Sequence, residues 1–103
     1  MAVYYIALRH GMTDENEMEI YRQKAPASLI NREFKVLAQY GRTRTTSGED
    51  PGIVAIMEFP SFEEAEDWYE SAEYQDAVRH LYAAADMQCF MVEGLPPELQ
   101  TPR

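Results

Sequence analysis

The chain has little basic charge, a single cysteine and no long apolar run. Nine lysines and arginines stand against 18 acidic residues, which gives a formal net charge of −9. A surface with this charge repels the phosphate backbone of nucleic acids and the surface of anionic membranes, so we expect neither as a partner. The only cysteine, Cys89, excludes an intrachain disulfide, and we interpret it as a buried thiol in a strand.

Targeting and cofactor signatures are also missing. The first residues lack the basic segment and cleavage site of a signal peptide, and no stretch is apolar for long enough to span a bilayer. We therefore expect a cytoplasmic protein. The two histidines, His10 and His80, form no metal-binding spacing, and no glycine-rich phosphate loop or serine-nucleophile motif occurs. The sequence thus predicts no metal and no nucleotide cofactor.

The predicted elements alternate in the order βαββαβ. Apolar and β-branched runs predict strands at Val3–Arg9, Phe34–Tyr40, Ile53–Phe59 and Met87–Glu93. Helical spacing of apolar residues predicts helices that start at Thr13 or Asp14, at Phe62 (ending at Glu70) and at Ala72 (ending at Ala84). This order indicates an α+β, ferredoxin-like fold, a four-stranded antiparallel sheet with its helices on one face. We expect a single domain over residues 1–94 and a Pro-rich tail over 95–103.

Local signals mark where these elements begin and end. Ser61 and Glu64 have the spacing of a capping box, in which the hydroxyl accepts a backbone N–H and the carboxylate reaches back. Ser71 is placed to cap the next helix. Gly11 is expected to end the first strand, and Pro26 to kink the first helix or to split it.

The third and fourth strands do not alternate between apolar and polar residues. Ile53–Met57 and Cys89–Val92 are continuous apolar runs, which is typical of strands buried on both sides. The helices can cover only one face of such a sheet. The sequence therefore predicts a homodimer that pairs through the other face.

Three motifs carry a family resemblance. They are the stretch Glu58–Gln75, Tyr21-Arg22 followed by Pro26-Ala27, and the closing Val92-Glu93-Gly94. Together they resemble the domain-of-unknown-function family 1330, within the dimeric α+β barrel superfamily, over roughly Val3 to Gly94. The resemblance implies a ferredoxin-like fold and a dimer, but no established chemistry. The wider superfamily includes cofactor-independent monooxygenases, small isomerases and proteins without known catalysis, and in several a small organic ligand sits between sheet and helices.

The candidate site residues lie on the predicted helices. His80 is the predicted acid–base catalyst, because an imidazole can exchange protons near neutral pH. Tyr21, Trp68, Tyr69 and Arg79 are the predicted substrate-binding residues, since tyrosine and tryptophan give a pocket apolar walls with polar tips. Trp68 and Tyr69 are adjacent, so they cannot both point the same way. The simpler interpretation is that the aromatic residues fill the core and the dimer interface.

Two functions remain open from the sequence. In the first, the protein binds a small organic molecule between sheet and helices and acts as a metal- and cofactor-independent enzyme, resembling a monooxygenase or an isomerase. In the second, it is a noncatalytic homodimeric binding or interaction module. A closed, mostly apolar pocket with convergent polar tips from Tyr21, Tyr69 or His80 would favour the first function, and side chains that fill that space completely would favour the second.

Overall fold

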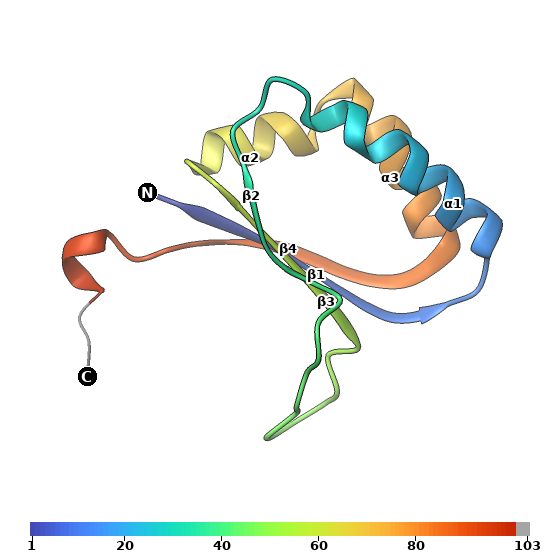
Figure 1. Ribbon diagram of the computed structural model, residues 1–103, viewed down its shortest axis with the longest axis horizontal. Coiled ribbons are helices and arrows are strands. Elements are labelled where there is room, and N and C mark those ends of the chain that lie inside the picture. Colours follow the sequence, from blue (N-terminus) through green and yellow to red (C-terminus); the bar gives the residue numbers. More distant parts are fainter. Residues whose placement is uncertain (101–103) are drawn as a thin grey trace.

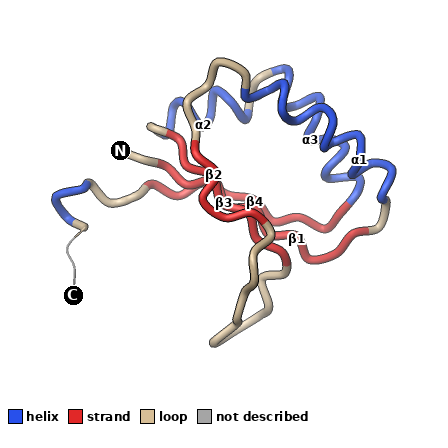
Figure 2. The backbone as a smooth tube through the Cα atoms, viewed as in Figure 1, coloured by secondary structure: helices blue, strands red, loops and turns tan. Residues whose placement is uncertain are grey.

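The computed structural model of the protein describes residues 1–100. Its elements are β1 (Val3–Met12), α1 (Glu15–Lys24), η1 (Ala25–Leu29), β2 (Lys35–Gln39), β3 (Ile53–Phe59), α2 (Phe62–Tyr69), α3 (Ala72–Ala84), β4 (Ala85–Glu93) and η2 (Pro97–Leu99). The α-helices and η1 form one layer over one face of the sheet (Figures 1 and 2). The chain therefore has the ferredoxin-like α+β fold that its sequence predicts.

The four strands form one antiparallel sheet in the order β2-β3-β1-β4. Tyr5 in β1 lies opposite Met57 in β3 and Met91 in β4, and the three side chains pack in or against the core. Because side chains alternate between the two faces of a strand, Ala7 and Arg9 share the helix-facing side with Tyr5.

Three of the four strands have bounds other than those predicted. Gly11 does not end the first strand, because β4 begins at Ala85 rather than at Met87 and provides partners for a longer β1. Met12 pairs with Ala85 after a register shift that follows Arg9. At the other edge, β2 starts at Lys35 and ends at Gln39, one residue shorter at each end than predicted.

The predicted helix starts are confirmed by the hydrogen bonds that cap them. The Asp14 carboxylate accepts backbone N–H groups at the start of α1. Ser61 Oγ accepts the Glu64 N–H at 3.1 Å, and Ser71 Oγ accepts the Tyr74 N–H, also at 3.1 Å. One half of the capping box is different from the prediction: the Glu64 carboxylate accepts the Ser61 hydroxyl at 3.3 Å rather than its backbone N–H.

Pro26 splits the first helical segment. Of the two predicted alternatives, a kink or a split, the second is therefore confirmed. It lies at the start of the 3₁₀ turn η1, which follows α1 directly. This turn carries Ser28, a polar side chain that is buried under α2. Ser28 Oγ accepts the indole N–H of Trp68 at 3.0 Å and donates to the carbonyl of Ala25. The turn thereby fixes the position of the largest side chain in the core.

The face of the sheet that points away from the helices is also apolar. We call it the outer face, and by register it comprises Tyr4, Ile6, Leu8, Val54, Ile56, Phe90 and Val92, with the polar Glu58 and Gln88 on the same side. Phe90 and Val92 are 41% and 44% exposed. β3 and β4 therefore carry apolar side chains on both faces of the sheet, as their sequences indicate, while the burial of the outer face stays a prediction.

Beyond β4, residues 95–100 lead away from the sheet, and η2 lies apart from it (Figure 1). The predicted tail continues to residue 103, and its last three residues lie outside the described part of the chain. Among residues 1–100, no helix combines the length and apolarity needed to cross a membrane.

The cap of α2 can be tested by mutation. Replacing Ser61 by Ala removes the hydrogen bond to the Glu64 N–H, and we expect the free energy of unfolding to fall by about 1 kcal/mol. Chemical denaturation followed by circular dichroism measures this change. Glu64→Ala is the control and should cost less, because the Glu64 N–H keeps its partner. A Ser61→Ala protein as stable as the original would contradict this account of the helix start.

Candidate functional site

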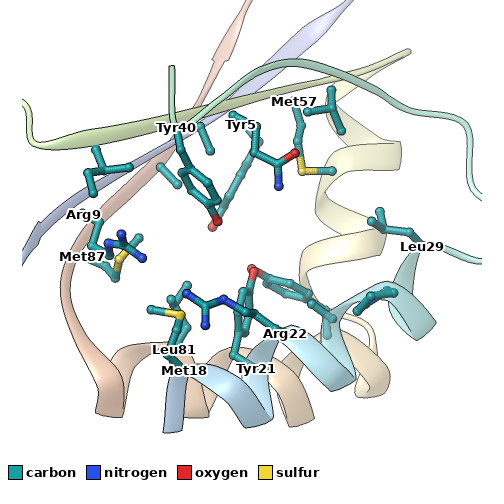
Figure 3. Close-up of a pocket in the computed structure, with 18 of the residues that line it drawn as sticks. Tyr5, Arg9, Met18, Tyr21, Arg22, Leu29, Tyr40, Met57, Leu81 and Met87 are labelled. Atoms are coloured by element: carbon teal, nitrogen blue, oxygen red, sulfur yellow. The ribbon is translucent and has the colours of Figure 1, made fainter. Parts of the chain in front are cut away.

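A cavity of about 300 Å³ lies between the sheet and the helix layer (Figure 3). Its volume is at the lower end of the range of small-molecule sites. Ala7 and Ala55, which are paired across β1 and β3, form part of its floor. Their methyl groups leave space that larger side chains would fill. We call this space the sheet–helix cavity.

The walls of the sheet–helix cavity are mostly apolar. Met57 and Met87 reach it from the sheet, and Met18, Leu29 and Leu81 from the helix layer. Three of the six methionines of the chain therefore line it. Methionine side chains are flexible and polarizable, so such walls adapt to the shape of a ligand and make favourable contacts with aromatic rings.

Two tyrosine hydroxyls meet at the helix side of the cavity. Tyr21 from α1 and Tyr74 from α3 share a hydrogen bond of 2.8 Å between their oxygens. Burial raises the pKa of Tyr21 to about 12 and also raises the pKa of Tyr74. Both phenols therefore stay protonated near neutral pH. Because one O–H suffices for the bond between them, the pair retains one O–H that can be donated to another oxygen.

Tyr40 faces this pair from the end of β2. Its backbone has a φ of 59°, in the left-handed region that costs a residue other than glycine about 1–3 kcal/mol. The Tyr40 N–H donates to the Val54 carbonyl at 2.9 Å, which holds the residue in place. Figure 3 shows the Tyr40 and Tyr21 side chains pointing toward one another across the cavity. Such strain gathers at ligand and active sites, so it marks Tyr40 as a candidate functional residue.

The only charged residues that line the cavity are two arginines, within the described part of the chain. The Arg9 guanidinium lies 5.6 Å from the centre of the Tyr40 ring, in a cation–π contact. Arg22 pairs with Glu19 at 3.5 Å, and both of these side chains are about half exposed. Figure 3 shows both guanidinium groups toward one end of the cavity, while Leu29 and Met57 lie toward the other end.

The structure brings together two of the five predicted site residues. Tyr21 and Trp68 both line the cavity. Tyr69 does not line it, and its hydroxyl instead lies 2.6 Å from the Tyr82 hydroxyl at an exposed position. Arg79 is also outside the lining and pairs with Asp76 on the surface of α3. The adjacent Trp68 and Tyr69 side chains therefore point in different directions, as expected.

His80, the predicted catalyst, lies outside the lining of the cavity. Its Nδ1 is 2.5 Å from Oε2 of Glu17, so the imidazole links α3 to α1. The His80 side chain is 12% exposed, and its Nε2 is buried without a hydrogen-bond partner in the described residues. This arrangement favours a structural role for His80 over the predicted acid–base role, which stays a prediction.

Sequence reasoning missed the arginines and Tyr40. A signal for Arg9 exists, because it continues the helix-facing alternation of Tyr5 and Ala7, where a charged side chain is unusual. Arg22 follows Met18 by one helical turn and so shares its face of α1. No sequence signal indicates the left-handed backbone of Tyr40, since the following Gly41 is the expected place for such a conformation.

The arrangement suits one kind of chemistry. Neutral phenols and guanidinium groups are hydrogen-bond donors, and an apolar, partly enclosed site strengthens their interaction with a negatively charged oxygen. The cavity can therefore hold, and stabilise, a carboxylate or an enolate. Among residues 1–100, no three His, Cys, Asp or Glu side chains gather into a group that could hold a metal ion.

Solved structures with the same fold are similar to this chain at low sequence identity. A protein of unknown function from Rhodopseudomonas palustris is 19% identical, with a TM-score of 0.70 over 93% of this chain and 84% of its own. A dimeric protein of unknown function with a ferredoxin-like fold, from Bacteroides fragilis, is 18% identical, with a TM-score of 0.57 over 90% and 96%. SnoaB, a cofactor-independent oxygenase from Streptomyces nogalater, is 12% identical, with a TM-score of 0.58 over 96% and 98%. At these identities the likeness shows the fold alone.

Comparison with curated proteins gave no significant match. The family comparison is more informative, because one family model matches residues 2–95, nearly the whole chain. It describes a domain of unknown function, DUF1330. This match covers all four strands and the helix layer, and with them every residue of the sheet–helix cavity. The chain therefore belongs to the DUF1330 family of domains of unknown function.

Proposed function

We propose that this protein is a homodimer that binds a small, largely apolar organic molecule in the sheet–helix cavity of each subunit. The observation that carries the proposal is the cavity itself, an open space of about 300 Å³ with apolar walls and a few polar groups that converge on it. Ligand sites commonly have this composition. A purely structural role for the aromatic residues would instead leave the interior filled.

The chemistry of the walls supports an aromatic ligand. Met18, Met57 and Met87 offer thioethers to a ring, and Tyr40 adds an aromatic side chain to the lining. A bicyclic aromatic molecule has a suitable size and shape for this space. Binding is also the step that any metal- and cofactor-independent reaction would require, and SnoaB, with a similar fold, is described as a cofactor-independent oxygenase.

The outer face supports the proposed dimer. Its apolar side chains have no cover from the helices, and a large exposed apolar patch usually marks an interface. The outer face of a second copy would provide an equally apolar surface to cover it. Two of the similar structures, from Bacteroides fragilis and from a Jannaschia species, are described as dimeric proteins with a ferredoxin-like fold.

The dimer can be tested at Ile56, which lies at the centre of the outer face opposite Ile6. Ile56→Lys would place a charge in the proposed interface, where burial without a partner is costly, so we expect the dimer to separate. Sedimentation velocity measures the change. Gln23→Lys introduces the same side chain at an exposed position on α1 and should leave the dimer intact. If the unchanged protein is a stable monomer at micromolar concentration, the proposed interface is wrong.

The cavity can be tested by filling it. Ala55→Phe would place a ring over the floor of the cavity, and we expect it to abolish binding of the neutral probe 2-naphthol, measured by isothermal titration calorimetry. Ala83→Phe makes the same replacement at an exposed position of α3 that does not line the cavity, and should bind as the original does. Probe binding that survives Ala55→Phe would show that the probe sits elsewhere and would contradict the proposed site.

A further inference from the structure

We propose that the ligand of the sheet–helix cavity is an organic anion, with a carboxylate or enolate oxygen at the Arg9–Arg22 end and an apolar ring system at the Leu29–Met57 end. This inference rests on the proposed function, since it names the class of molecule that the same cavity takes. A site of this kind selects its ligand by charge as well as by shape.

The first argument is the sign of the charge in the cavity. The chain carries twice as many acidic as basic residues, yet among residues 1–100 no aspartate or glutamate lines the cavity, and both charged lining residues are arginines. From the average composition of this acidic protein, we would expect more acidic than basic residues around a cavity. The observed lining has the opposite sign of charge. A cationic ligand would be repelled by these guanidinium groups, and a neutral ligand would offer them only an uncharged, weaker acceptor.

The second argument is that neither arginine is committed to a strong ion pair in the described residues. Arg9 contacts the face of the Tyr40 ring and has no carboxylate within ion-pair distance among residues 1–100. Arg22 has only Glu19, one turn away at 3.5 Å, and exposed pairs of this kind contribute little. The guanidinium groups therefore keep N–H donors for a ligand, and their planar geometry suits bidentate contact with a carboxylate.

The third argument is the supply of neutral donors beside the arginines. The Tyr21–Tyr74 pair has one O–H to give, and the Tyr40 hydroxyl points toward it from the other side of the cavity (Figure 3). An ionised ligand oxygen accepts several hydrogen bonds, and those from charged or polar donors are stronger than bonds between neutral groups. The strained backbone of Tyr40 is then explained by the need to hold its ring against Arg9 with its hydroxyl toward the ligand.

The inference is tested with two probes of nearly equal shape, 2-naphthoate and 2-naphthamide. Both fit the same apolar walls, but only the first carries an anionic oxygen. For the unchanged protein we expect 2-naphthoate to bind about tenfold or more tightly than the amide, as measured by calorimetry, because hydrogen bonds to a charged group are the stronger ones. Equal affinities for the two probes would overturn the inference.

Three arginine variants then locate the effect. Arg9→Gln and Arg22→Gln should each lower the affinity for 2-naphthoate by about tenfold and leave the amide nearly unchanged. Arg42→Gln removes the same charge from the exposed loop between β2 and β3, outside the cavity, and should change neither affinity. Arg22 is half exposed on a helix, so its variant is expected to fold even if the Arg9 variant does not. An Arg42→Gln protein that loses as much affinity as the cavity variants would show a general surface effect and overturn the inference.

The outcomes separate this inference from the proposed function. If the amide and the carboxylate bind equally and both lose binding in Ala55→Phe, the cavity is a ligand site without charge selection, and only the inference fails. If neither probe binds the unchanged protein, the proposed function fails and the inference fails with it.

Discussion

The burial of Trp68 is the interaction on which the rest of the structure depends. Its side chain is 2% exposed and stands at the meeting point of the sheet and the helix layer. The ring stacks on Phe59 of β3 at 5.1 Å, meets Tyr5 of β1 edge-on at 5.0 Å and lies 4.1 Å from the Tyr74 ring of α3. Its N–H is satisfied by Ser28 of η1. One residue thus connects two strands, α3 and the turn that follows α1.

The geometry of the cavity follows from this cluster. Tyr74 packs against Trp68. Its hydroxyl forms a hydrogen bond with the hydroxyl of Tyr21 in α1 and so fixes the position of that group. Toward Arg9 and Tyr40, the floor is built from Ala7 and Ala55, and nothing as large as Trp68 fills the space above them. The same sheet therefore carries a packed core at one end and an open cavity at the other. The strained backbone of Tyr40 is held outside this cluster, by its hydrogen bond to the Val54 carbonyl and its contact with Arg9.

Much of the fold could be read from the sequence because the relevant signals are local. Ser61 and Ser71 cap helices through atoms three residues away, and the strand periodicity requires only neighbouring residues. The cavity could not be read in this way. Arg9, Arg22 and Tyr40 come from separate segments and meet only after the sheet and helices pack. His80 was predicted as catalyst from the chemistry of imidazole alone, while its position is decided by the packing of α3 against α1.

The sheet–helix cavity is the centre of this account, since the proposed ligand and its charge both depend on it. A crystal structure of the protein grown with 2-naphthoate tests it most directly. We expect the rings between Met57 and the helix layer, with the carboxylate within hydrogen-bond distance of Arg9 or Arg22 and the Tyr21 hydroxyl close by. A structure in which side chains close the cavity, or in which the probe lies only on the outside of the protein, would contradict the account.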